Sequence, residues 1–375
     1  KHFHNVLCLS EAKGMDIKMN RILFEGRLLV SMAASVARQD DLRPLHGKLD
    51  WERMFRIADY NRIADLIYVA VLGNEKVPQQ WRDRFFERYQ ESLRFGDICT
   101  EGEQEFLALL ESREIPALIV GSSSRRLLYE MPEMAGVCSL CLYMNTENYV
   151  LAKGYLIDLG YETDRAYGVY GERLRRPDGF SVELYDGIPY KTPFYHKQLS
   201  RLLDRGETAV PYTHIRILSP SDRLIWLFAQ AAYLYATDQL LVRHLMDLCV
   251  LHRSLAETPE MERIWQRLKG LKIGSLCEKL LGLGYMWFGT KEERAVSPSQ
   301  DELEVYDVIE NRILGYGKEY PETMPEALAL TGSILKAEER ENRHARRKLL
   351  YRRFMDDCNE LYSLFRKKDQ QDSLK

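Results

Sequence analysis

The stretch Ser139–Met144 reads SLCLYM and is the core of the second of two strands predicted in the middle of the chain. The first strand is Ala117–Val120, a short apolar run that is stopped by Gly121. A short apolar run bounded by turn residues is typical of a buried strand. The residues before Ile115 show only helical periodicity, so the change of pattern there marks the start of a different kind of domain.

The chain after these strands is predicted to complete a small mixed sheet. A helix capped by Thr146 follows, and it ends at Gly160, a residue suited to the left-handed position after a helix. Two further strands flank the turn Pro177–Gly179, in which proline presets φ and glycine accepts a positive φ. Residues 115–190 are therefore predicted to run β-α-β-α-β-β, with helices on one side of the sheet.

Both flanks of this sheet are predicted to be helical. Before it, apolar residues recur at three- and four-residue steps, as in Leu28, Leu29 and Met32. After it, Ser219–Asp222 reads SPSD, a strong helix start with a cap, a proline in the first turn and an acid three residues on. We therefore expect an α+β fold in three regions: a helical region at 1–113, an α/β core at 114–217 and a helical region at 218–375.

Composition excludes several classes of protein. The chain has 375 residues, 45% hydrophobic and 29% charged, as in ordinary globular proteins of two or three domains. A net charge of −3 argues against nucleic-acid binding driven by overall charge, and no apolar run reaches the ~18–20 residues of a membrane span. Seven scattered cysteines and the lack of a signal-peptide pattern predict a cytoplasmic protein with no membrane partner.

Five short motifs occur in a fixed order along these regions. They are VGS at Val120–Ser122, LYEMP at Leu128–Pro132, SLCL at Ser139–Leu142, VEL at Val182–Leu184 and RHLMDL at Arg243–Leu248. In this order the motifs resemble the polymerase-β-like nucleotidyltransferase superfamily. More narrowly, they are similar to those of an uncharacterised bacterial nucleotidyltransferase family. The resemblance covers about residues 20–270.

The resemblance implies a metal site whose carboxylates are mostly missing here. Ser139 and Cys141 stand where the family carries Asp-x-Asp, Glu183 stands at its third carboxylate, and Val120 replaces its lysine. Nucleotidyl transfer uses two divalent ions about 4 Å apart, and Mg²⁺ prefers carboxylate oxygens. Aspartates two apart on a strand point to one face and so reach one metal cluster. Glu183 alone remains as catalytic and metal-binding candidate, which predicts a pseudoenzyme impaired in nucleotidyl transfer.

A candidate nucleotide site follows the first strand. Gly121, Ser122, Ser123 and Arg125 form a glycine turn into a helix N-terminus, which presents free N–H groups to an anion. A second arginine, Arg126, follows. The alternative interpretation is a capped helix with a solvated basic face.

Three functions remain open at this point. The leading hypothesis is a catalytically impaired nucleotidyltransferase-fold protein that binds a nucleoside triphosphate, an RNA or a protein partner, with no certain cofactor. The first alternative is an active Mg²⁺-dependent nucleotidyltransferase with relocated carboxylates, for which Glu133 and Asp186 are candidates. The second is a helical interaction scaffold with no ligand.

Three further features are weighed in the same way. Cys138 and Cys141 have the spacing of a redox or zinc motif, but buried cysteines of a sheet are the simpler interpretation. Arg243 and Asp247, four apart on a helix, are expected to pair with each other. A charged helix at 334–368 carries enough arginine to bind RNA, although a docked, solvated helix explains it as well.

Overall fold

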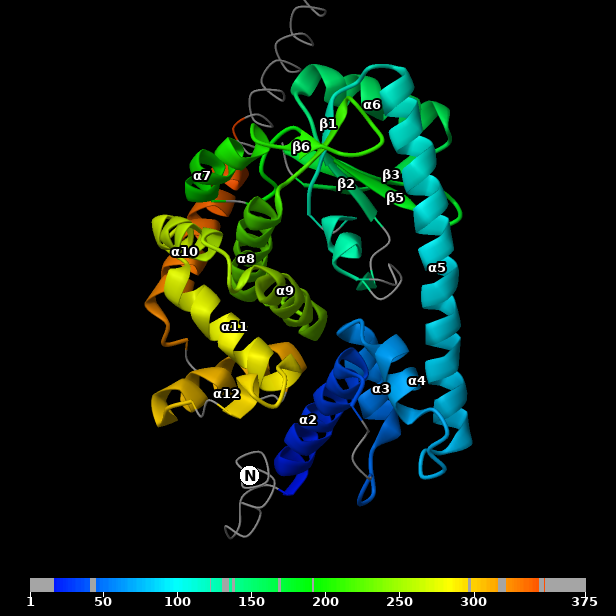
Figure 1. The fold of residues 1–375 in the computed structure, drawn as a ribbon, viewed down its shortest axis with the longest axis vertical. Helices are drawn as coiled ribbons and strands as arrows, with labels where there is room; N and C mark the ends of the chain where they lie inside the picture. Colours follow the sequence, from blue (N-terminus) through cyan, green and yellow to red (C-terminus); the bar gives the residue numbers. More distant parts are fainter. Residues whose placement is uncertain are drawn as a thin grey trace, which may run out of the picture.

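The computed structural model describes residues 17–40, 45–121, 123–129, 135–136, 139–167, 170–190, 192–295, 298–315, 322–343 and 347. Over these residues the chain is α+β, as predicted, with a mixed sheet between two sets of helices (Figure 1). None of the described helices combines the length and apolar character needed to cross a bilayer. The predicted helix at 334–368 falls largely outside the described residues, which are helical over 325–343.

The described helices before the sheet are α2 (Ile17–Arg38), α3 (Trp51–Tyr60), α4 (Ala64–Val71) and α5 (Gln79–Ser112). The start of α3 is fixed by Asp50, whose side chain accepts a hydrogen bond from the Arg53 amide at 3.1 Å. The long helix α5 runs from these helices to the sheet (Figure 1). It therefore connects the N-terminal helices to the domain that carries the predicted site.

The sheet contains more strands than predicted. The described strands are β1 (Ala117–Ile119), β2 (Ser139–Tyr143), β3 (Glu162–Ala166), β4 (Gly171–Arg175), β5 (Ser181–Tyr185), β6 (Glu207–Thr208) and β7 (Ile215–Ile217), in the order β3-β4-β5-β2-β1-β7-β6. Between them lie η1 (Ser123–Leu128), α6 (Thr146–Asp158) and α7 (Pro193–Leu203). Strand β3 was missed because all five of its residues are exposed, and β6 and β7 because they are very short.

The two faces of the sheet belong to different cores. Leu140 and Leu184 lie in a core with apolar residues of α5 and α6. Cys141 and Tyr185, which alternate with them along β2 and β5, lie in the larger core formed with the helices that flank the sheet. The predicted site residues therefore face these helices rather than α6.

Six helices follow the sheet. They are α8 (Pro220–Ala236), α9 (Val242–Leu255), α10 (Glu260–Gly270), α11 (Gly274–Phe288), α12 (Gln300–Leu314) and the helical residues 325–343. Ser219 caps α8 as predicted, by accepting from the Asp222 amide at 3.2 Å. One local prediction was wrong, because the cap of α6 is Asn145 rather than Thr146. Helices α10 and α11 are separated by a turn in which Lys272 adopts a φ of 55°.

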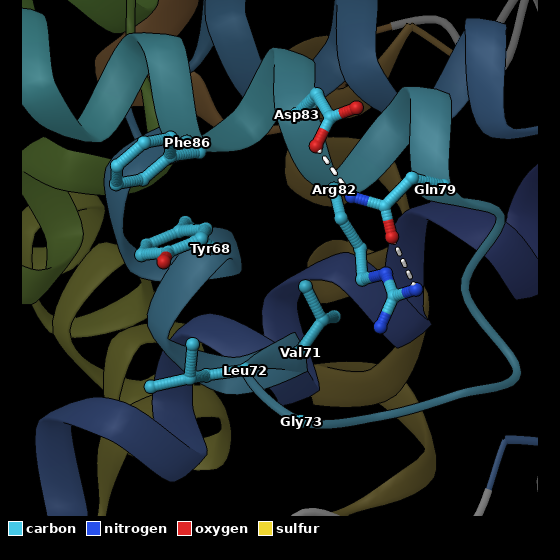
Figure 2. A pocket seen from close by; sticks show the side chains of 8 residues that line it. All are labelled: Tyr68, Val71, Leu72, Gly73, Gln79, Arg82, Asp83 and Phe86. Carbon is cyan, nitrogen blue, oxygen red and sulfur yellow. Dashed lines mark hydrogen bonds between the residues drawn. The ribbon is translucent and has the colours of Figure 1, made fainter.

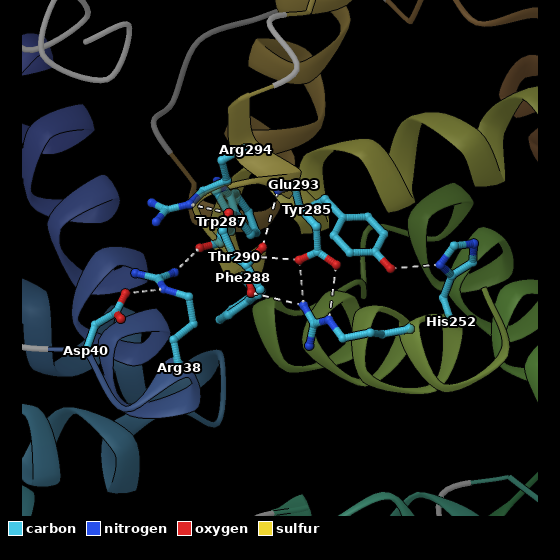
Figure 3. Close-up of polar contacts among 10 residues, drawn as sticks. Arg38, Asp40, His252, Tyr285, Trp287, Phe288, Thr290, Glu293 and Arg294 are labelled. Carbon is cyan, nitrogen blue, oxygen red and sulfur yellow. Dashed lines mark hydrogen bonds and ion pairs between the residues drawn. The ribbon is translucent and has the colours of Figure 1, made fainter. Parts of the chain in front are cut away.

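Polar contacts join the end of α2 to the C-terminal helices (Figure 3). Arg38 donates to the Trp287 carbonyl oxygen at 2.8 Å and binds Asp40 at 2.7 Å. Nearby, Arg253 binds Glu293 at 3.0 Å. The buried apolar residues of both helical regions also form one core. The two helical flanks are therefore packed together although the sheet domain separates them in sequence.

The close contact between Gly102 of α5 and Phe180 predicts that one added methyl group will lower the stability of the protein. Gly102 faces Phe180, and a Cβ at Gly102 would lie 2.4 Å from the Phe180 ring. We expect Gly102→Ala to lower the free energy of unfolding by about 1–3 kcal/mol through overpacking. Gly154→Ala is the control, because nothing lies within 4 Å of its Cβ position on the exposed side of α6. It should raise stability by about 0.5–1 kcal/mol. Urea unfolding measures both, and equal effects would contradict the packing.

Candidate functional site

The three positions predicted to bind metal lie side by side. Strands β2 and β5 are parallel neighbours, and their register places Ser139 beside Ser181 and Cys141 beside Glu183. The Ser139 and Ser181 hydroxyl oxygens are 2.8 Å apart, and the Cys141 Sγ atom lies 3.6 Å from Glu183 Oε2. The three positions that the resemblance assigns to a metal site are thus adjacent on two neighbouring strands.

The residues at these positions do not fit a pair of Mg²⁺ ions. Glu183 Oε2 accepts hydrogen bonds from the Tyr185 hydroxyl and the Cys141 thiol. Cys141 offers a soft sulfur and Ser139 a neutral hydroxyl, whereas Mg²⁺ requires hard oxygen ligands. Over the described part of the chain, no three His, Cys, Asp or Glu side chains are grouped so that they could hold a metal ion. Among the described residues, Glu183 is therefore the one carboxylate at these positions, whereas the reaction needs several.

Of the two proposed replacement carboxylates, Asp186 lies in the described part of the chain. Asp186 follows β5 and its Oδ2 atom lies 3.4 Å from the Thr146 hydroxyl, at the start of α6. It joins no metal-binding group with Glu183 among the residues that can be described. Glu133 lies outside the described residues, as does Cys138 of the Cys-x-x-Cys pair. Cys141, Cys249 and Cys277 are free and buried, and Cys99 is disulfide-bonded.

The glycine turn is held tightly against β2. Gly121 has a φ of +59°, and a Cβ there would lie 3.4 Å from the Cys141 Cβ, so glycine suits both the backbone and the space. The Ser123 hydroxyl donates to the Val120 carbonyl at 3.0 Å and accepts from the Cys141 amide at 3.2 Å. Ser123 therefore uses its hydroxyl to fasten η1 to the two strands. Ser122 lies outside the described residues.

The two arginines of this turn form ion pairs within the protein. Arg125 binds Asp247 of α9 at 2.7 Å, and both side chains are almost fully buried. Asp247 also accepts a hydrogen bond from Tyr129 at 2.6 Å. Burial, followed by the Asp247 charge, raises the pKa of Tyr129 well above its ordinary value. Arg126 binds Glu103 of α5 at 3.2 Å, so this turn does not present a solvated basic face.

Arg243 does not pair with Asp247, contrary to the expectation from their spacing. It binds Asp65 of α4 at 2.8 Å, and its Nε donates to the Arg62 carbonyl at 2.8 Å. The Val242 amide donates to the Asn61 side chain at 3.0 Å. The start of α9 is buried against the turn between α3 and α4, so its side chains pair across elements rather than along the helix. These bonds bring that turn to the site.

Sequence reasoning missed Arg62, which lies in this turn. Its side chain is exposed, yet the surrounding protein lowers its pKa by desolvation, and Arg125, Arg243 and Arg173 lower it further by charge repulsion. Glu183 acts in the opposite direction on the same pKa. The Arg62 carbonyl accepts from Arg243 of α9, and Asp247, one turn further along the same helix, binds Arg125, so the Arg62 backbone lies beside this cluster of arginines. No sequence signal marked it, because its neighbours come from four separate elements.

The comparison with family models decides the family. Residues 47–289 match the model of a family described as an uncharacterised nucleotidyltransferase. The match spans well over half of the 375 residues, from α3 to the end of α11, and contains every site residue above. The chain belongs to this nucleotidyltransferase family. Comparisons with curated proteins and with solved structures gave no match.

A pocket of this nucleotidyltransferase-family chain lies away from the sheet. It has a volume of about 190 Å³ and is enclosed by α4 and the start of α5 (Figure 2). Tyr68 and Phe86 line one side, while Gln79 links Arg82 and Asp83 by hydrogen bonds of 2.6 Å on the other. None of the predicted site residues lines it, so we do not place the family's chemistry there.

His244 of α9 is held neutral beside the arginine cluster. Its Nδ1 atom accepts a hydrogen bond from the Leu241 amide at 3.0 Å, which places the proton of the neutral ring on Nε2. Burial, followed by the charges of Arg125, Arg62 and Arg243, lowers its pKa well below the ordinary value. A neutral His244 supports the helix start without adding charge to the site.

The depressed pKa of His244 predicts how stability depends on pH. Below pH ~6.5 the unfolded chain binds a proton that the folded chain does not, so the free energy of unfolding falls by up to about 1.4 kcal/mol per pH unit. His244→Gln should remove this contribution, because glutamine can also accept from the Leu241 amide. Urea unfolding between pH 7 and 5 measures the slope, with His46→Gln at an exposed position as control. An unchanged slope in His244→Gln would show that His244 titrates normally.

Proposed function

We propose that this nucleotidyltransferase-family protein binds a nucleotide on the sheet face around Cys141 and Glu183 and has lost Mg²⁺-dependent nucleotidyl transfer. The observation that carries the proposal is the register of β2 and β5, which keeps the three metal positions together with one carboxylate among them. A single carboxylate cannot hold two Mg²⁺ ions against water. The binding geometry of the family is then retained while its chemistry is impaired.

The expected nucleotide-binding turn belongs to this proposal in a modified form. The side chains of Ser123 and Arg125 are used within the protein, so we assign them the role of holding the turn in place. Gly121 and Ser122 remain candidate nucleotide-binding residues of this turn. This division explains why a turn with two arginines need not present either of them to solvent.

Two other functions compete with this one. An active enzyme with relocated carboxylates would need acids beside Glu183 that the described residues do not supply. A scaffold without a ligand would leave the sheet face empty. An RNA or a protein could also occupy that face, but the arginines there are few and mostly paired with acids, which favours a small anionic ligand.

Nucleotide binding with and without Mg²⁺ tests the proposal. We expect calorimetry with ATP, GTP, CTP and UTP to show micromolar binding of at least one of them, with the same affinity in Mg²⁺ and in EDTA. The reason is that the site lacks the ligands for a metal that would bridge protein and phosphates. Strict dependence on Mg²⁺ would support the active enzyme instead. No binding of any nucleotide would support the scaffold.

Restoring the carboxylates should restore metal binding. In Ser139→Asp/Cys141→Asp the two new acids lie two apart on β2, with Glu183 directly beside the second. We expect this variant to bind Mn²⁺, observed by electron paramagnetic resonance, at concentrations at least tenfold below those that the natural protein needs. The matched control is Ser139→Asn/Cys141→Asn, which has the same size without the charge. Equal Mn²⁺ binding by both variants would show that the register does not form a metal site.

A further inference from the structure

We propose that Arg62 binds the phosphates of the ligand and supplies the positive charge that metal ions supply in active nucleotidyl transfer. This inference rests on the proposed function, and it names the residue and the part of the ligand that meet. Its physical basis is charge. A triphosphate needs cationic neutralisation, and a site without Mg²⁺ ligands must obtain it from side chains.

The turn between α3 and α4 holds Arg62 in place. Arg243 donates to the Arg62 carbonyl at 2.8 Å and binds Asp65 three residues on, while Asn61 accepts from the start of α9. The backbone of Arg62 is in the left-handed region, with a φ of 55°. Its main chain is thus fixed by neighbours on both sides. The side chain extends into solvent from a rigid position.

Arg62 is the member of the arginine cluster whose guanidinium is available. Arg125 binds Asp247, Arg243 binds Asp65 and Arg173 binds Asp164 at 2.5 Å. Among the residues that the structure describes, the Arg62 guanidinium has neither an ion-pair nor a hydrogen-bond partner. The other three arginines are neutralised by acids, and Arg62 retains its charge and all five donors.

The sheet contributes to the proposed site a row of side chains across β2, β5 and β4. The register places Cys141 beside Glu183 and Glu183 beside Arg173. Glu183 receives hydrogen bonds from Cys141 and Tyr185, which disperse its negative charge. The Nε atoms of Arg125 and Arg173 are buried without a hydrogen-bond partner among the described residues, so each leaves one N–H donor unused. Acids neutralise the charges of these two arginines and of Arg243, so Arg62 supplies the charge that an anion would meet here.

The chemistry of the guanidinium defines the class of ligand. Arginine is charged at every physiological pH, and its planar fork donates two parallel hydrogen bonds to phosphate oxygens. Such a contact needs no metal bridge. It also favours a polyphosphate, because each further phosphate adds negative charge and oxygen acceptors for the guanidinium. We therefore infer a nucleoside triphosphate or a free polyphosphate as the ligand.

The test compares Arg62→Met with Arg56→Met in the full chain, in EDTA. Arg56 lies on α3, is exposed and forms no ion pair with another described residue, so its loss removes the same charge from the same region. Calorimetry with ATP, tripolyphosphate and adenosine separates the phosphate contact from contacts to the base. We expect Arg62→Met to weaken ATP binding by about 10- to 100-fold, the range for a hydrogen bond to a charged group. Arg56→Met should change it less than twofold.

A second variant guards against a loss caused by misfolding. Arg62→Lys keeps the charge without the planar fork, so it should bind with intermediate affinity, and its thermal unfolding should match that of the natural protein. Tripolyphosphate binding that depends on Arg62 while adenosine fails to bind would support a free polyphosphate as ligand. Preference for ATP would support a nucleotide.

The outcomes separate this inference from the proposed function. If the natural protein binds ATP in EDTA and Arg62→Met binds equally well, Arg62 is not the phosphate anchor and the proposed function stands. If the natural protein binds ATP only with Mg²⁺, or does not bind it at all, both are wrong. Equal weakening by Arg56→Met would also overturn the inference, because it would show an effect of net charge alone.

Discussion

The buried ion pair between Arg125 and Asp247 connects every part of the site. It joins η1, which follows β1, to α9 of the C-terminal helices, and the Tyr129 hydroxyl satisfies the second oxygen of the carboxylate. Removing one partner of a buried pair leaves an uncompensated charge, at a cost of about 3–5 kcal/mol. Arg243, one turn earlier on α9, makes the equivalent connection to Asp65 of α4. The sheet and both helical flanks are thereby held around one face of β2 and β5.

The sequence predicted the central strands and the α8 start because their signals are local. The apolar run before Gly121 and the cap at Ser219 need no distant partner to be recognised. Strand β3 could not be predicted, because it is exposed on every residue and forms only by pairing with β4. The break between α10 and α11 at Lys272 is also difficult to predict, because apolar residues keep a helical spacing on both sides of it.

The candidate site was partly predictable, because its motifs can also be recognised in the sequence alone. Motif order placed Ser139, Cys141 and Glu183 on strands that the structure brings into register. Ion pairs between residues far apart in the sequence could not be predicted. Arg243 binds Asp65 instead of Asp247, and Asp247 binds Arg125. Arg62 belongs to none of the sequence motifs. It is positioned near the candidate site by the packing of α9 against the α3–α4 turn. Pairing across elements is therefore where sequence reasoning failed.

The attachment of the α3–α4 turn to α9 bears on the kinetics of ligand binding. The bonds from Val242 to the Asn61 side chain and from Arg243 to the Arg62 carbonyl hold the turn in place before any ligand arrives. The turn itself therefore loses little conformational entropy on association, and the ordering cost falls on the Arg62 side chain. Association at such a site is governed by diffusion and by the electrostatic attraction between the anion and the arginines, and so it slows as salt screens that attraction.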